Sequence, residues 1–241
     1  MRVWSPGVLL LCAAVLCAAV AALATFAAVH QPWLGLNLAY SPSAAAIASV
    51  DAEGPSAQVP VGTLIAVGGM AIEPHDVIPE ADANGRYPIV DSFYARQKAL
   101  AALQASETVA LTVQTTAGAQ EVSVAPRPSR PIGDLPVEFW VQLFAGVIAC
   151  IIGAWVWALK PSDWGARFFA LSGASMLAFT NSAAVYSTRE LALDSGLYQG
   201  LALGNMFGAV TFGVAMIGLF LVYSAGQGVF AALLPRLFPG S

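Results

Sequence analysis

The sequence predicts an α+β membrane protein in which a polar, β-rich domain is inserted between one transmembrane helix and a segment of three more. Hydrophobic residues make up 58% of the 241 residues and charged residues only 10%, a composition outside the range of ordinary soluble domains. The block of residues 33–126 is mostly polar, whereas the chain is strongly apolar on both sides of it.

The N-terminal run Val8–Val29 carries no charge and has about the 20 residues that a transmembrane helix needs. We therefore expect residues 1–30 to form a membrane anchor. A cleaved signal peptide is the alternative, because Ala22, Ala24, Ala27 and Ala28 resemble a small-residue cleavage site. The run is longer than the apolar core of a usual signal peptide, which favours the anchor.

Three more spans are predicted within residues 137–223, at Val137–Leu159, Gly165–Tyr186 and Leu197–Val222. The last has glycine at every fourth position, with an asparagine beside this face: Gly196, Gly200, Gly204, Gly208 and Asn205. Such spacing lets another helix approach closely, either within the bundle or across a homodimer seam. We expect residues 224–241 to lie at the membrane interface or to begin a further helix cut short.

Short strands are predicted in the first part of the polar block. Leu34-Gly35-Leu36 enters an extended run, and Ala46–Val50 alternates in polarity. Gly62 opens a β-branched run that closes on the pair Gly68-Gly69, a turn signal.

The second part of the block predicts a helix and a hairpin. Apolar residues within Asp91–Ala105 follow helical spacing, with Asp91 or Ser92 as the expected N-terminal cap. Val109–Val113 and Glu121–Val124 alternate at period two around Ala117-Gly118-Ala119 and predict a terminal β-hairpin.

This order of elements resembles a PDZ domain over residues 33–126. The resemblance rests on Leu34-Gly35-Leu36, on Gly54-Pro55-Ser56-Ala57, and on Gly62 before Val67-Gly68-Gly69. Thr63 departs from it, since bacterial PDZ domains usually carry an acidic residue after the turn glycine. The resemblance implies a peptide groove in which the backbone amides of Leu34, Gly35 and Leu36 meet a carboxylate or extend a sheet edge, with Phe93 and Leu100 on the opposite wall.

Residues 127–136 are predicted to form a proline-rich linker, because neither a helix nor a central strand tolerates so many prolines. It either transmits a displacement of the domain to the next helix or acts as a spacer. Basic residues next to the spans favour both termini in the cytoplasm and residues 31–136 in the periplasm of a bacterial inner membrane. Arg2, Lys160, Arg167 and Arg236 would then lie inside, and Arg127, Arg130 and Arg189 outside.

No catalytic residue, metal site or cofactor is predicted. The chain has two histidines, His30 and His75, too few for a His-based metal site or an intramembrane metalloprotease. His75-Asp76 is interpreted as a surface turn. No run of Lys or Arg points to a nucleic-acid partner, and the three cysteines lie in apolar stretches, where thiols behave as small hydrophobes.

A second resemblance covers residues 136–223. The phrases at 135–142 and 166–173, and above all Tyr186–Leu193 with Arg189 and Glu190, resemble the input region of bacterial membrane sensor histidine kinases. In such two-component systems a PDZ-like extracytoplasmic domain precedes several transmembrane helices and a cytoplasmic kinase. The phosphoacceptor and ATP-binding regions are absent from these 241 residues. A kinase cut short, a shifted reading frame or a stand-alone input module would each give this sequence.

The resemblance implies a signal-input module, embedded in membrane lipid, that senses a peptide, a periplasmic protein or an envelope signal and relays it through its helices. A membrane scaffold that recruits a partner through the PDZ-like domain and transmits nothing is the alternative. Neither hypothesis makes this chain an enzyme.

Overall fold

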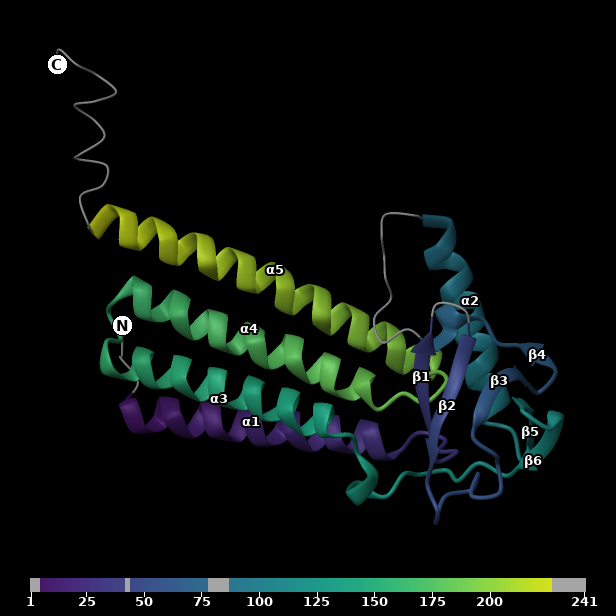
Figure 1. Cartoon of the computed structure of the whole chain (residues 1–241). Helices are drawn as coiled ribbons and strands as arrows, with labels where there is room; N and C mark the ends of the chain where they lie inside the picture. Colours follow the sequence, from purple (N-terminus) through teal and green to yellow (C-terminus); the bar gives the residue numbers. More distant parts are fainter. Residues whose placement is uncertain (1–4, 42–43, 78–86, 227–241) are drawn as a thin grey trace. The chain divides into compact units, whose positions relative to one another are not determined.

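The structure is a computed structural model that describes residues 5–41, 44–77 and 87–226 (Figure 1). It confirms a mixed helix-and-sheet protein, with one antiparallel sheet and four helices long and apolar enough to cross a membrane. The chain divides into two compact units. The helical unit takes Met1–Ala24, Val137–Ala184 and Leu201–Ser241, and the β-rich unit takes Thr25–Pro136 and Val185–Gly200.

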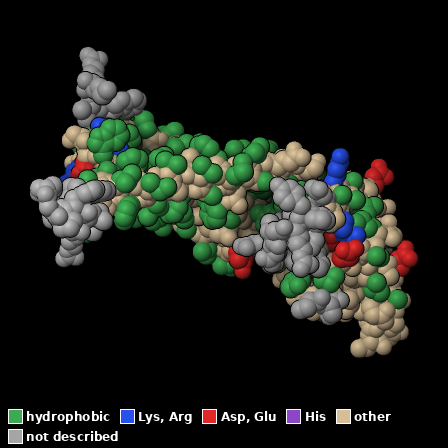
Figure 2. All heavy atoms as spheres, turned by 90° about the horizontal axis from the view of Figure 1, so that it is seen from above, with side chains coloured by type: hydrophobic (Ala, Val, Ile, Leu, Met, Phe, Trp, Pro, Cys, Tyr) green, Lys and Arg blue, Asp and Glu red, His purple; other side chains and the backbone are tan. Residues whose placement is uncertain are grey.

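The long helices agree closely with the predicted spans. They are α1 (Pro6–Val29), α3 (Val137–Leu159), α4 (Trp164–Ser187) and α5 (Ser195–Gly226). Within the helical unit they lie side by side in the order α1, α3, α4, α5 (Figure 1). Their surface is largely apolar, as Figure 2 shows, which suits contact with lipid. Arg2 and most of the tail predicted at 224–241 lie outside the described residues.

Small residues bring the helices of this unit into close contact. A β-carbon at Gly153 of α3 would lie 3.0 Å from Cα of Ala170 in α4, and one at Gly173 of α4 would collide with the Ala149 carbonyl oxygen. Cys17, Cys150 and Leu177 form a buried cluster that joins α1, α3 and α4. Close backbone approach of this kind is a common way for helices to pack in a membrane.

The β-rich unit contains a six-stranded antiparallel sheet, in the order β1-β2-β3-β5-β6 with β4 paired to β3. The strands are β1 (Leu36–Ser41), β2 (Ala44–Val50), β3 (Gly62–Val67), β4 (Met70–Ala71), β5 (Val109–Thr115) and β6 (Gly118–Val124). Gly68 and Gly69 both have positive φ, 56° and 80°, and form the tight turn between β3 and β4. Two successive glycines in the sequence predict such a turn. The predicted terminal hairpin is confirmed, with Thr115 opposite Gly118.

Helix α2 (Tyr87–Gln104) packs on this sheet through Leu100, which is fully buried with Leu36, Leu64 and Leu111. It begins earlier than predicted, so the expected cap at Asp91 or Ser92 is wrong and both residues lie inside the helix. Pro88 stands in the first turn, where a missing N–H costs nothing, and this allows the earlier start.

Residues Pro74–Val77 form a short 3-10 helix, η1. The prediction that His75-Asp76 is a surface turn is wrong, because Asp76 is only 1% exposed. Its carboxylate accepts hydrogen bonds from Nε and a terminal nitrogen of Arg96 in α2, at 2.8 and 2.6 Å, and from the Glu73 amide at 2.8 Å. These bonds fasten α2 to the segment that follows β4.

The proline-rich linker is tied to the start of the β-rich unit. Trp33 and Arg127 exchange two backbone hydrogen bonds of 2.8 and 2.9 Å, and the Arg127 guanidinium lies 5.6 Å from the centre of the Trp33 ring. A 3-10 turn, η2 (Ile132–Asp134), follows before α3. The linker therefore leaves the sheet beside the point where the chain enters it.

Candidate functional site: a groove that holds a carboxylate

The site is built on a backbone turn, Leu34-Gly35-Leu36, which leads from α1 into β1. Gly35 has φ +79°, a conformation that side chains rarely adopt, and a β-carbon there would also stand 3.1 Å from Cα of Gly54. The Ser56 amide donates to the Leu34 carbonyl at 3.0 Å and the Asp51 amide to the Gly35 carbonyl at 2.9 Å. These two hydrogen bonds fix the carbonyls of Leu34 and Gly35. The N–H groups of Leu34, Gly35 and Leu36 are then available to bind an anion.

The carboxylate of Glu190 occupies this turn. Its Oε2 accepts from the Leu34 amide at 2.6 Å, and its Oε1 accepts from the amides of Gly35 and Leu36 at 2.8 and 3.0 Å. Glu190 comes from the connection between α4 and α5, which belongs to the same compact unit as the turn. The side chain is 3% exposed, so the three hydrogen bonds replace the water that it has lost.

Arg130 of the linker is the charged partner of this carboxylate. One terminal nitrogen lies 3.8 Å from Oε1 of Glu190, and the other donates to the Thr188 carbonyl at 2.8 Å. Burial raises the pKa of Glu190 to about 7, and the three amides and Arg130 oppose this rise. The site therefore holds a carboxyl group whose charge changes near neutral pH.

The residues after Glu190 are buried in the hydrophobic core of the β-rich unit. Leu191 is fully buried and belongs to the same core as Leu34, Leu36 and Leu100. The Ala192 amide donates to the side-chain oxygen of Gln104 at 3.4 Å, and the Gln104 amide nitrogen donates to the Pro32 carbonyl at 2.7 Å. The connection therefore contacts both the amide turn and α2, and we call the space that it fills between them the groove. No strand pairing between this connection and β1 occurs among the described residues.

Arg189, the residue before Glu190, lies in a cluster of aromatic side chains. Its guanidinium carbon is 4.8 Å from the Tyr186 ring centre and 5.9 Å from that of Phe93, and it donates to Gln97 at 3.1 Å. The ring centres of Phe93 and Tyr198 are 6.3 Å apart. Burial lowers the pKa of Arg189 below its ordinary value, and the tyrosines act against this.

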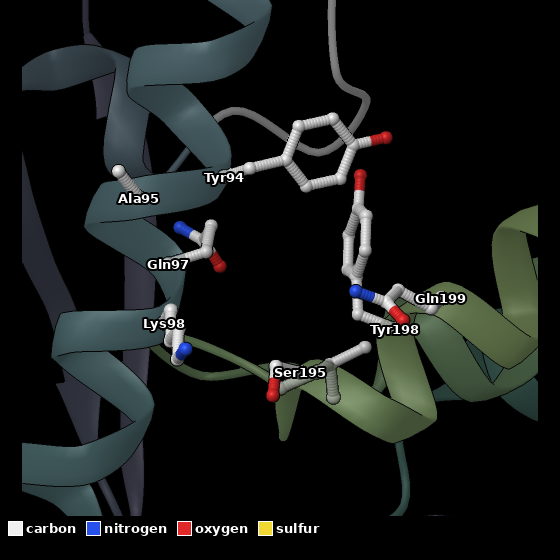
Figure 3. Close-up of a pocket in the computed structure, with 8 residues that line it drawn as sticks. Tyr94, Ala95, Gln97, Lys98, Ser195, Tyr198 and Gln199 are labelled. Carbon is white, nitrogen blue, oxygen red and sulfur yellow. The ribbon is translucent and has the colours of Figure 1, made fainter.

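A small hollow of about 180 Å³ opens beside this cluster, between α2 and the start of α5 (Figure 3). Tyr94 and Tyr198 lie on one side of the hollow with their ring centres 5.2 Å apart, and Lys98 and Ser195 lie on the other side. The remaining lining residues are Ala95, Gln97, Leu193 and Gln199.

All five residues predicted for the groove lie against the connection between α4 and α5. Leu34, Gly35 and Leu36 meet Glu190, Leu100 shares a core with Leu191, and Phe93 faces Tyr198 and Arg189. Arg189 and Glu190, which the sequence predicts in the outer loop between the second and third of the C-terminal spans, are the two charged residues of that connection within the site. Sequence reasoning missed Gln104, Arg130 and Leu191, although the apolar phrase Leu191-Ala192-Leu193 between two spans was a usable signal of burial.

The glycines that recur at every fourth position in α5 differ in what surrounds them. Gly204 and Gly208 face α4, where β-carbons would stand 2.8 Å from Oγ of Ser182 and 3.0 Å from the Phe179 amide nitrogen. Gly200 has open space around it, Gly196 is near only Asp194, and Asn205 is exposed. In the described parts of the chain, no group of three His, Cys, Asp or Glu residues could hold a metal ion.

In comparisons with known proteins, no protein-family model, no curated protein and no solved structure matches the chain. Chemically, three backbone donors and one guanidinium next to a cluster of buried aliphatic side chains suit an anionic, partly apolar chain segment.

Proposed function

We propose that the protein is a membrane signal-input module of a bacterial inner membrane. Its β-rich unit acts as a PDZ-like periplasmic domain that senses a peptide, a protein or an envelope signal. The membrane helices relay this signal, as in the input region of a sensor histidine kinase. One observation carries the proposal: the carboxylate of Glu190, from the connection between two membrane helices, lies on the amides of Leu34, Gly35 and Leu36.

This contact supports a relay because a short connection joins the residue that fills the candidate binding turn to two membrane helices, α4 and α5. Only residues 188–194 separate α4 from α5, so a shift of Glu190 acts on the ends of both helices. A ligand changes a conformational equilibrium only by binding two states with different affinity. A turn that is filled in one state and vacant in the other provides that difference.

Distance measurements on the full chain in lipid nanodiscs test the relay. Spin labels on cysteines introduced at Ser162 and Tyr223, both exposed and both in the helical unit, report on that unit, with Cys12, Cys17 and Cys150 replaced by alanine. We expect Glu190→Ala to shift the measured distance by about 1–2 Å or more, the size of known helix shifts in switching proteins. Glu121→Ala, an exposed carboxylate on β6, is the matched control.

A non-signalling scaffold remains the second candidate. The deep burial of Leu191 and Leu193, 0% and 1% exposed, favours it, because a connection built into a core also suits a permanent structural role. This alternative predicts the same distance distribution for the parent chain, Glu190→Ala and Glu121→Ala. That result would count against the relay and for the scaffold.

A further inference from the structure

The connection between α4 and α5 presents two adjacent groups to the groove in the manner of a bound ligand. The Glu190 carboxylate accepts hydrogen bonds from all three amides of the turn, and the buried Leu191 side chain belongs to the same hydrophobic core as Leu36 and Leu100. Both side chains come from a segment that is more than 150 residues from the turn in the sequence, since Leu34 and Glu190 are 156 apart. The groove is therefore filled by the protein's own chain.

We infer that residues 188–193 are an internal ligand of this groove, displaced when a chain segment bearing a carboxylate beside an aliphatic side chain binds in their place. This inference rests on the proposed function and adds the class of ligand and the way in which binding is regulated. The chemistry of the site selects that class. The turn offers N–H donors and Arg130 a positive charge, which suit an anion, and the core that holds Leu191 contains leucine side chains.

Tethering decides how strongly the internal ligand competes. A segment held by a short connection has an effective concentration of the order of millimolar. A free peptide with the same sequence must overcome that concentration, so its apparent affinity for the filled groove is at best about millimolar. When the groove is vacated, the same peptide binds with its intrinsic affinity. Removing the internal ligand should therefore strengthen external binding.

The experiment uses the full chain in nanodiscs and a dye-labelled peptide that copies residues 188–193, with both ends blocked. Fluorescence anisotropy compares the wild type with the double variant Glu190→Ala, Leu191→Ala, which removes both the carboxylate and the leucine side chain. We expect the double variant to bind at least tenfold more tightly than the wild type. A peptide with glutamine in place of its glutamate should lose most of this gain.

Hydrogen exchange of the same samples checks that the variant is folded and where the peptide lies. The amides of Leu34, Gly35 and Leu36 should exchange faster in the double variant and become protected again when the peptide is added. If the variant proves unfolded, Glu190→Ala alone is used with the same two readouts.

Equal affinity of the peptide for wild type and variant, or no binding to a folded variant, overturns the inference. Binding that leaves the three amides unprotected also overturns it. These outcomes are separate from a failure of the proposed function, in which the peptide binds the vacated groove but the spin-label distances in the helical unit do not change.

Discussion

Glu190 shows how one residue can be both deeply buried and ionisable. A carboxylate loses water when it is buried, and this cost is offset only when hydrogen bonds and an opposite charge replace the water. The amides of Leu34, Gly35 and Leu36 and the guanidinium of Arg130 supply these replacements. They offset only part of the cost, so burial still raises the pKa of Glu190 to about 7.

The first prediction concerns the substitution Glu190→Gln. The carboxamide keeps one acceptor oxygen but turns an NH2 group toward backbone donors. At least one buried amide is then left without an acceptor, so the docked connection should lose about 1–3 kcal/mol. Hydrogen exchange of the Leu34–Leu36 amides in the full chain measures this loss. Glu121→Gln, on the exposed surface of β6, should leave the exchange unchanged. Equal protection in both variants would contradict the role given to Glu190.

The second prediction is a dependence of docking on pH. The docked pKa of about 7 lies above the ordinary value of 4.5, so the docked state binds a proton more tightly than the released state does. Docking is therefore strongest below pH 4.5 and weakens as the pH rises from about 4.5 to about 7. Arg130 is the charged group facing Glu190 in the described structure, with a terminal nitrogen 3.8 Å from Oε1.

Hydrogen exchange of residues 190–193, corrected for the intrinsic effect of pH, measures this dependence. Glu190→Gln removes the titrating group, so the difference between wild type and variant isolates its contribution. A wild-type profile that is parallel to the variant profile between pH 4.5 and 7 would refute the prediction.

At the scale of elements, the docking of α2 depends on a buried ion pair. Asp76 is 1% exposed and accepts two hydrogen bonds from Arg96, whose own terminal nitrogen also donates to the Ala71 carbonyl at 2.7 Å. The pKa of Arg96 is raised, with the hydrogen bond to Asp76 as the main cause. This pair therefore holds one wall of the groove in place.

The third prediction is that Asp76→Asn destabilises the β-rich unit by about 1–3 kcal/mol, because an amide cannot replace both acceptor oxygens. The change should appear as faster hydrogen exchange in α2 of the full chain. Asp134→Asn, at an exposed position before α3, is the matched control. Loss of protection to the same extent in both variants would show that the ion pair is not the cause.

The fourth prediction concerns helix packing. A side chain at Gly173 meets the backbone of α3, whereas Gly213 has open space around it. Gly173→Ala should therefore cost about 1–3 kcal/mol through overpacking, and Gly213→Ala should be neutral or slightly stabilising through its higher helix propensity. Thermal unfolding in detergent compares the two. Equal midpoints would argue against close α3–α4 packing at Gly173.

Elements that depend on local pattern could be predicted from the sequence. The length of an apolar run fixed Val137–Leu159 to the residue, and the Gly68-Gly69 pair located a tight turn. The start of α2 could not be predicted in this way, because two good capping residues lie inside the helix. From the PDZ resemblance, the amide turn was expected to meet a carboxylate or to extend a sheet edge. The residue that fills it could not be predicted, since a contact between residues 156 apart leaves no periodic signal.

At the scale of the whole molecule, the two compact units are interleaved in the chain. The β-rich unit consists of Thr25–Pro136 and of Val185–Gly200, a second segment that lies between two membrane helices. Leu191 and Ala192 of this second segment belong to the core of the sheet. The stability of the β-rich unit therefore depends on residues encoded after most of the membrane part.

The fifth prediction follows from this arrangement. Leu191→Ala should destabilise the β-rich unit by about 2–5 kcal/mol, the usual cost of truncating a buried leucine, although it lies outside residues 25–136. Hydrogen exchange of β5 in the full chain reads out this effect. Val61→Ala, at a side chain that is 63% exposed, should have little effect. An unchanged β5 in Leu191→Ala would mean that the second segment only lies against the sheet.

The distance of 156 residues between Leu34 and Glu190 also sets an order of events during synthesis. At about 5–20 residues per second, roughly eight to thirty seconds pass between translation of the turn and translation of the residue that fills it. During that interval the nascent chain contains the three amide donors of Leu34, Gly35 and Leu36 but not yet the carboxylate that they bind in the complete fold. Completion of this site therefore has to wait for synthesis of the connection between α4 and α5.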